Sequence, residues 1–225
     1  MFMHPLINQN KSVYNAIASQ FSATRAFLWD DLKGLERYAQ AHDTILDLGC
    51  GNGRLYQLFQ NMQVDYTGVD QSEGLLEQAK EKFPNQQFLL GDFAKIPLQD
   101  NSVDKIYAIA SYHHLPDETT RVQSLFEMKR VLKTNGTIIL LNWNLHSDWA
   151  KKKYAKVEKE PGEFFVPWKT GDGESLGERY YHGFTLEELA DLAEQADLKV
   201  QENFYIKKGE VSDKENGENM LTVLS

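Results

Sequence analysis

Alternating glycines follow the first apolar run of this sequence. The run that begins at Thr44 leads into Gly49-Cys-Gly51-Asn-Gly53, with glycine at every second position. Glycine lets the backbone turn sharply and approach a ligand where a Cβ atom would clash, and the free N–H groups of a following helix can bind a carboxylate or phosphate. The dinucleotide fingerprint Gly-x-Gly-x-x-Gly places its third glycine one residue later, so a pyrophosphate cradle is less favoured. By itself the turn predicts either a ligand site or a plain strand-to-helix connection.

Carboxylates end the next two apolar runs. Asp70 ends the second run, 17 residues after Gly53, where a carboxylate can accept hydrogen bonds from both hydroxyls of a ribose. Asp92 and Phe93 end the third run, which brings a carboxylate and an aromatic ring within reach of an adenine amino group. Three such signals in this order predict a site for a ligand that contains a nucleoside.

The elements that must position these residues alternate between strands and helices. Strands are predicted over 44–49, 64–69, 87–90, 103–110 and 137–143, and helices over 54–61, 72–82 and 119–132. A helix over 185–196 and strands over 199–207 and 220–224 follow. This alternation predicts an α/β fold, with a Rossmann-like, doubly wound, mostly parallel seven-stranded sheet and an antiparallel C-terminal hairpin. Such sheets bind ligands at the carboxyl ends of their strands, where the glycines and aspartates lie.

Helix boundaries and faces follow from the same spacing. Two linked helices are expected between residues 12 and 41. Ser72 and Thr185 are expected to cap the helices that follow them, Thr185 in a capping box with Glu188. The helix over 119–132 is expected to turn four apolar side chains inward: Val122, Leu125, Phe126 and Val131.

The whole chain, 1–225, is expected to form one domain. Its parts are N-terminal helices over 1–42, a cofactor-binding core over 43–145, an insertion or lid over 146–184, and a C-terminal helix and hairpin over 185–225. The insertion loses the helical and strand patterns and contains Pro161-Gly162 and Gly171-Asp-Gly173, so it is expected to be long and partly mobile.

Composition excludes several classes of protein. The 24 basic and 33 acidic residues give a net charge of −9, which argues against non-specific binding of DNA or another polyanion. No apolar run approaches the ~20 residues of a membrane span, and the N-terminus lacks a secretory signal, so a cytoplasmic protein is expected. One cysteine rules out an internal disulfide, and no Cys/His spacing indicates a metal site. Lysines cluster over 151–169 beside Trp149, Tyr154 and Trp168, which indicates either a solvated face or a local basic patch.

Five stretches in order resemble the motif series of class I S-adenosylmethionine-dependent methyltransferases. They are Asp47-Leu-Gly-Cys-Gly-Asn-Gly53, Gly68-Val-Asp70, Gly91-Asp-Phe93, Asp104-Lys-Ile-Tyr-Ala-Ile-Ala-Ser-Tyr-His-His114 and Arg130-Val-Leu-Lys-Thr-Asn-Gly136. The resemblance implies S-adenosylmethionine as the cofactor. The residues it implies are Gly49, Cys50, Gly51, Asn52 and Gly53 at the methionine part, Asp70, Gln71 and Ser72 at the ribose, Asp92 and Phe93 at the adenine, and the backbone of Ala110 near the methionine end.

A narrower resemblance involves the flanks of this core. The segment from Val13-Tyr14 to Arg25, Val166-Pro-Trp168 and Arg179-Tyr-Tyr-His182 are similar to the eukaryotic tRNA methyltransferases that esterify 5-carboxymethyluridine at the wobble position. The resemblance implies that Tyr14 and Arg25 help to close the cofactor pocket, with Arg25 on the methionine carboxylate. It also implies tRNA as a partner and a small zinc-binding activator subunit. The segment between Trp168 and Arg179 is shorter than the insertion that this family often carries.

The chemistry that follows is an in-line displacement at a methyl group, which chiefly requires that the acceptor be held about 3 Å away and aligned. A carboxylate acceptor is already anionic and needs no general base. Arg179 is expected to grip a substrate carboxylate or phosphate, and His182 to donate a second hydrogen bond. The alternative is that both cap the final helix or pair with acids of the insertion. His114 or its neighbour His113 is expected to line the acceptor pocket, and a packing role is an equal alternative.

Three function classes remain open from the sequence. A tRNA wobble-uridine methyltransferase is the leading one. The alternatives are a methyltransferase of a small acceptor, such as a carboxylic acid or quinone precursor, and a non-catalytic cofactor-binding protein. A positive surface that joins the lysine cluster to the pocket mouth would support RNA, whereas a closed apolar cavity would support a small acceptor.

Overall fold

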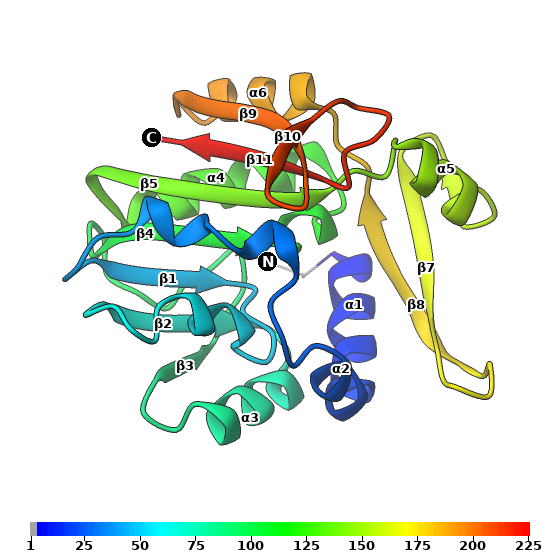
Figure 1. Ribbon diagram of the computed structural model, residues 1–225, viewed down its shortest axis with the longest axis horizontal. Coiled ribbons are helices and arrows are strands. Elements are labelled where there is room, and N and C mark those ends of the chain that lie inside the picture. The colour runs from blue at the N-terminus through cyan, green and yellow to red at the C-terminus, as the bar shows by residue number, and fades with distance from the viewer. Residues whose placement is uncertain (1–3) are drawn as a thin grey trace.

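The computed structural model describes residues 4–225, and its centre is an eight-stranded sheet (Figure 1). The parallel strands are β1 (Thr44–Leu48), β2 (Asp65–Asp70), β3 (Gln87–Leu90), β4 (Val103–Ile109) and β5 (Leu132–Trp143). Beyond β5 the sheet continues with β11 (Asn219–Leu224), β9 (Val200–Lys207) and β10 (Glu210–Ser212), each antiparallel to its neighbours. The predicted sheet is confirmed except for its strand count. It has eight strands rather than seven because β10 folds back onto β9.

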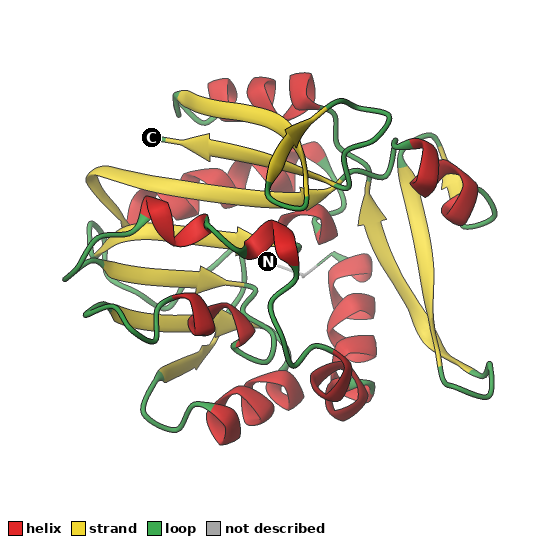
Figure 2. Cartoon of the chain, viewed as in Figure 1, coloured by secondary structure: helices red, strands yellow, loops and turns green. Residues whose placement is uncertain are grey.

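Helices cover both faces of this sheet (Figure 2). On one face α4 (Glu118–Val131) and α6 (Leu186–Gln195) pack on a core that includes Leu46. On the other, α3 (Glu73–Lys82) packs on a core that includes Ile45. Successive strand residues point to opposite faces, so a strand buried on both sides is mostly apolar. Over 44–48 the one charged residue is Asp47, and the Tyr66 hydroxyl donates a hydrogen bond to it. Within residues 4–225, no helix is long and apolar enough to cross a membrane.

The N-terminal helices begin earlier than the spacing predicts. They are α1 (Pro5–Ala16) and α2 (Ala18–Thr24), followed by short 3-10 turns over 30–32 and 35–38 instead of a second long helix. Gly34 separates these turns with a φ of +92°, which no continuous helix can accommodate. The helix predicted over 54–61 is likewise a 3-10 helix, Arg54–Leu58.

Helix caps agree with prediction better than helix faces do. The N–H of Leu75 donates to Ser72 Oγ at 3.2 Å, and the N–H of Glu188 donates to Thr185 Oγ1 at 3.1 Å. The side chain of Glu188 turns elsewhere, so the capping box is only half formed. Phe126 is 45% exposed rather than inward, because it lies about 100° around α4 from Leu125, which is buried.

The segment over 146–184 is not a patternless insertion. It forms α5 (Asp148–Tyr154) and a second sheet of β6 (Glu158–Glu160), β7 (Glu163–Lys169) and β8 (Ser175–His182), all antiparallel, with a small core of its own. The Asn10 amide ties α1 to β8, because its Nδ2 donates to the Tyr180 carbonyl at 3.0 Å and its Oδ1 accepts from the Tyr180 N–H at 2.8 Å. Figure 1 shows β7 and β8 standing beside α1 at one end of the main sheet, where they form a wall.

Candidate active site

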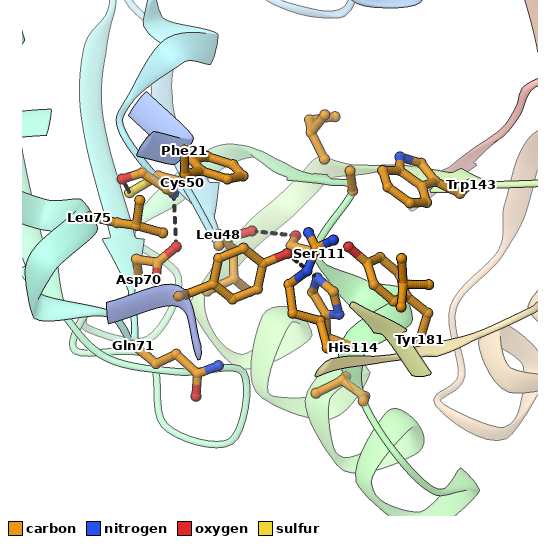
Figure 3. Close-up of a pocket in the computed structure, with 18 of the residues that line it drawn as sticks. Phe21, Leu48, Cys50, Asp70, Gln71, Leu75, Ser111, His114, Trp143 and Tyr181 are labelled. Atoms are coloured by element: carbon orange, nitrogen blue, oxygen red, sulfur yellow. Dashed lines mark hydrogen bonds between the residues drawn. The ribbon is translucent and has the colours of Figure 1, made fainter. Parts of the chain in front are cut away.

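A large cavity opens at the carboxyl ends of β1, β2 and β4. Its volume is about 1640 Å³, larger than the ~300–1,000 Å³ of ordinary ligand pockets, so two ligands fit side by side. Figure 3 shows Cys50 and Asp70 on one side of it and Trp143 and Tyr181 on the other. The predicted residues that line it are Tyr14, Arg25, Gly49, Cys50, Gly51, Asn52, Asp70, Gln71, Asp92, Phe93, Ala110, His114 and Arg179. Gly53, Ser72 and His182 do not line it.

The Asp70 carboxylate joins the glycine turn to the start of α3. Its Oδ2 accepts the N–H of Gly51 at 2.8 Å, and its Oδ1 accepts the N–H of Ser72 at 2.8 Å. Burial raises the pKa of Asp70, and these backbone hydrogen bonds oppose the rise. Gly49 adopts a φ of +76°, and a Cβ atom there would collide with Ser111, so the turn requires glycine at this position.

Gly53 and Ser72, which were expected among the cofactor-binding residues, lie behind the cavity lining and support the turn and α3. A Cβ atom on Gly53 would meet the ring of Phe88 at 2.9 Å, so this glycine allows close packing beneath the turn. Ser72 is fully buried, and its hydroxyl donates to Asn15 Oδ1 at 2.7 Å while capping α3.

Two arginines line the cavity close to Asp47. Burial, together with the nearby charge of Arg25, lowers the pKa of Arg54 to about 10, and Asp47 opposes this. Burial raises the pKa of Asp47 to about 7 against the hydrogen bond that the Tyr66 hydroxyl donates to it at 2.6 Å. Two positive groups at one end of a cavity favour an anion there. Sequence reasoning missed Arg54, although its place directly after the glycine turn is a usable signal.

Arg179 is a buried cation without an acidic partner. Its side chain projects from β8 among the rings of Tyr14, Trp168 and Tyr181, with the guanidinium carbon 5.7, 5.1 and 5.3 Å from the ring centroids. The residue is 5% exposed, and its Nε has no hydrogen-bond partner. Across residues 4–225, no carboxylate lies within 4 Å of it. An anionic ligand would complete this arrangement.

His182 lies on the opposite face of β8, which contradicts the expectation that it helps Arg179 hold the acceptor. The two residues are three apart, and strand residues an odd number apart point to opposite faces. His182 Nδ1 lies 2.8 Å from Glu163 Oε1, and Nε2 lies 2.8 Å from Glu188 Oε1. Through these two carboxylates the His182 ring links β7 and β8 to α6. Arg121 joins the same cluster, 3.3 Å from Glu188.

His114 lines the cavity as a neutral side chain. Its Nδ1 lies 2.7 Å from the Tyr180 carbonyl, which can only accept, so Nδ1 carries the hydrogen. Its Nε2 therefore accepts from the Tyr14 hydroxyl at 2.9 Å. Burial lowers the pKa of His114 to about 3. Both nitrogens are thus occupied, and the ring holds Tyr14 beside Arg179. His113 is buried and accepts the N–H of Trp143 at 3.3 Å, so it has the packing role.

We expect the free energy of unfolding to fall through His114 as the pH drops from about 6.5 to about 3. The side chain has a pKa near 6.5 when unfolded and about 3 when folded, so protons bind preferentially to the unfolded chain in this window. The stabilisation is present above pH 6.5 and is lost as the pH falls through the window. Denaturant unfolding across this range should show a shallower pH slope for His114→Asn than for wild type. The exposed His42 gives the control, His42→Asn, and equal slopes for both variants would refute the neutral assignment.

Sequence comparisons place these features among methyltransferases. A family model described as a methyltransferase domain matches residues 46–140. A protein of Encephalitozoon cuniculi named as a methyltransferase is 31% identical over 83% of this chain and 85% of its own length. Two proteins named tRNA (carboxymethyluridine(34)-5-O)-methyltransferase are also similar. That of Schizosaccharomyces pombe is 28% identical over 86% of this chain and 90% of its own length, and that of Mus musculus is 30% identical over 63% of this chain but only 21% of its own length.

Solved structures share the fold at low sequence identity. A chain from the complex between the Haloferax volcanii Trm112 methyltransferase activator and a methyltransferase matches over 96% of both chains, with a TM-score of 0.71 and 19% identity. A chain from a complex described as DhpI with SAM and HEP matches over all of both chains, with a TM-score of 0.72 and 18% identity.

The Encephalitozoon cuniculi methyltransferase is similar over most of both chains, and the methyltransferase domain model covers the strand-end motifs. These two matches show the family of this chain. This chain belongs to the S-adenosylmethionine-dependent methyltransferases, and its cofactor is S-adenosylmethionine.

Proposed function

We propose that this enzyme transfers its methyl group to a carboxylate carried by a modified wobble uridine of tRNA. The observation that carries this proposal is the buried guanidinium of Arg179, which lines the cavity without an acidic partner. An unpaired buried charge is costly, and an Arg–carboxylate pair can form two parallel hydrogen bonds that also fix the orientation of the acceptor. The relatives named tRNA (carboxymethyluridine(34)-5-O)-methyltransferases support a uridine carboxylate.

The residues on the β1–β3 side of the cavity fit the adenosyl part of the cofactor, which supplies the activated methyl group when bound. Each carboxylate oxygen of Asp70 accepts one backbone N–H, and the remaining lone pairs can accept hydrogen bonds from ribose hydroxyls. Asp92 and Phe93 line the same side and are proposed to meet the adenine. Gln71 lines the cavity directly after Asp70 and is proposed to border the same nucleoside.

The methionine part is proposed to lie at the other end of the glycine turn. Arg25 and Arg54 form a positive pair there that suits a carboxylate, and Asp47 beside them suits an ammonium group. The remaining residues proposed for this end line the cavity around that group: Tyr14, Gly49, Cys50, Gly51, Asn52 and Ala110.

The acceptor side requires orientation rather than proton transfer. A carboxylate with an ordinary pKa near ~4 is ionised at neutral pH, so it needs no base to act as a nucleophile. The state of His114 agrees with this, because both ring nitrogens are already occupied. Trp143 and Tyr181 stack at 4.9 Å with 14° between their planes, which gives a flat apolar wall beside Arg179. Aromatic walls of this kind suit a planar base.

The surroundings of the cavity favour RNA over a small acceptor. Two members of the lysine cluster over 151–169, Lys153 and Lys169, line the cavity together with Trp149 and Trp168. The cluster therefore reaches the pocket mouth, which is the arrangement expected for an RNA substrate. A small activator subunit is part of the proposal, supported by the structural neighbour that was solved from a complex with an activator.

Removing the Asp70 carboxylate should weaken cofactor binding. We expect the dissociation constant for S-adenosylmethionine, measured by calorimetry, to rise tenfold or more in Asp70→Asn and Asp70→Ala, equivalent to about 1.4 kcal/mol. Asp65, exposed at the opposite end of β2, provides the control variant Asp65→Ala. Thermal unfolding separates lost binding from lost folding, and wild-type affinity in a folded Asp70→Asn would refute the ribose assignment.

Replacing Arg179 should abolish transfer while sparing the cofactor. The assay is labelled methyl transfer to total tRNA from a strain that lacks its own wobble methylation, with and without an activator subunit, followed by nucleoside mass spectrometry. Wild type should give the methyl ester of 5-carboxymethyluridine. Arg179→Ala should lose about a hundredfold in kcat/KM, or about 2.7 kcal/mol, with the cofactor dissociation constant within twofold. Arg37→Ala, on the surface, is the matched control.

Two outcomes would contradict this account. Loss of cofactor binding together with transfer in Arg179→Ala would make the arginine structural. Label that enters a small carboxylic acid but no tRNA would replace the proposed acceptor with the small-molecule alternative.

A further inference from the structure

We propose that Trp149 and Lys153 on α5 bind a nucleotide adjacent to the methylated uridine, with Trp149 stacking on its base and Lys153 contacting its phosphate. This inference rests on the proposed function for the identity of the RNA. It concerns a second contact, outside the place where the acceptor carboxylate meets Arg179.

Trp149 is an exposed aromatic side chain at the rim of the cavity. Among residues 4–225, the large apolar side chains that are substantially exposed are Phe27, Leu90, Phe126, Trp149 and Val211. Of these, only Trp149, at 58% exposure, lines the cavity. Tyr154 contacts it at a right angle, with 5.9 Å between ring centroids and 89° between planes, so the two rings are not stacked on each other. An open indole face beside an acceptor site suits the face of a base.

A series of aromatic rings connects this rim to Arg179. Tyr181, two residues after Arg179 on the same face of β8, stacks on Trp143. Trp143 also stacks with Tyr154, with 6.4 Å between ring centroids and 16° between ring planes. Tyr154 then contacts Trp149. The rim of the cavity at Trp149 is therefore continuous with the stacked rings of Trp143 and Tyr181. Figure 1 shows α5 next to β7 and β8, at the same end of the molecule.

Lys153 supplies positive charge at the same place. Its Nζ lies 4.4 Å from the centroid of the Trp149 ring and 5.2 Å from that of Tyr154. In the described part of the chain, none of the lysines over 151–153 forms an ion pair with a carboxylate. Three unpaired lysines on a seven-residue helix that carries one acid, Asp148, stand out in a chain of net charge −9. This local charge complements a phosphate, whereas the chain as a whole repels a polyanion.

Trp149 and Lys153 together form a binding platform, and the helix that carries them is held rigidly, which lowers the entropic cost of binding. Ala150 and Tyr154 are buried in the core of the small sheet, and the hydroxyl of Ser147 accepts the N–H of Ala150 at 3.2 Å. Trp149 and Lys153 are four residues apart, so they lie on one side of the helix. The combination of a stacking ring and an adjacent free cation is typical of single-stranded nucleic acid binding.

The test compares two substrates and two pairs of variants. The substrates are an anticodon stem-loop RNA that carries 5-carboxymethyluridine and the free 5-carboxymethyluridine nucleoside. The variants are Trp149→Ala and Lys153→Ala, with Phe126→Ala and Lys80→Ala as exposed controls away from the cavity. Binding of the stem-loop is measured by fluorescence anisotropy over a range of salt concentrations, with the demethylated cofactor present, and kcat/KM is measured for both substrates.

We expect Trp149→Ala to weaken stem-loop binding at least tenfold with an unchanged salt slope. Lys153→Ala should weaken binding and reduce the slope of log K against log salt by about 0.7, the value for one phosphate contact on a single strand. Both variants should lose at least tenfold more in kcat/KM for the stem-loop than for the nucleoside. The controls should match wild type.

Wild-type affinity and salt slope in both variants would overturn the platform, as would a wild-type enzyme that does not bind the stem-loop. Equal losses on stem-loop and nucleoside would place Trp149 in the acceptor pocket itself. Loss of activator binding with normal RNA binding would make α5 a protein interface. If the wild type binds the stem-loop through α5 but methylates neither substrate, the proposed function fails and the platform stands.

Discussion

A buried positive charge that has no acidic partner within residues 4–225 governs one half of the cavity. The Arg179 guanidinium is removed from water by three aromatic rings, which interact favourably with a cation but cannot neutralise it. Ion pairs satisfy most buried arginines, and here the cavity is the remaining direction from which an anion can come. In the proposed reaction the same feature removes the need for a proton acceptor, since a carboxylate that pairs with arginine is already ionised and can act as a nucleophile.

The rest of the fold keeps that charge in place. The small antiparallel sheet that carries Arg179 is fixed to α1 by Asn10 and to α6 by the hydrogen bonds of the His182 ring. His114 then orients Tyr14 against the guanidinium from the main sheet. The parallel sheet contributes the opposite half, in which Asp70 joins the glycine turn to α3. The residues proposed to hold the acceptor and those proposed to hold the cofactor thus come from two sheets that meet across one cavity.

The cofactor half could be predicted from local sequence, and the acceptor half could not. The buried parallel strands are short and mostly apolar, and chain order fixes which residues end or follow them, so Asp70 and Asp92 could be placed at strand ends without a structure. The segment over 146–184 could not be predicted in this way. Its strands alternate only briefly and are interrupted by Pro167 and an exposed turn, so the period of two was missed. Without that period, Arg179 and His182 could not be assigned to opposite faces.

Contacts between distant residues account for the remaining differences. The stack of Trp143, Tyr154 and Tyr181 joins three separate elements, and no local pattern reports it. The N-terminal turns are set by the positive φ of Gly34, which overrides an apolar spacing that favours a helix. Arg54 becomes a site residue because a 3-10 helix begins directly at the glycine turn.

We propose that Arg179 selects a negatively charged acceptor, and a comparison of two ligands in a calorimeter can test this selectivity. With the demethylated cofactor present, 5-carboxymethyluridine and its uncharged amide analogue, 5-carbamoylmethyluridine, are each titrated into the enzyme in a calorimeter. The two ligands match in size and shape and differ in charge. This account predicts that the carboxylate binds at least tenfold more tightly than the amide. Equal affinity for both would contradict it.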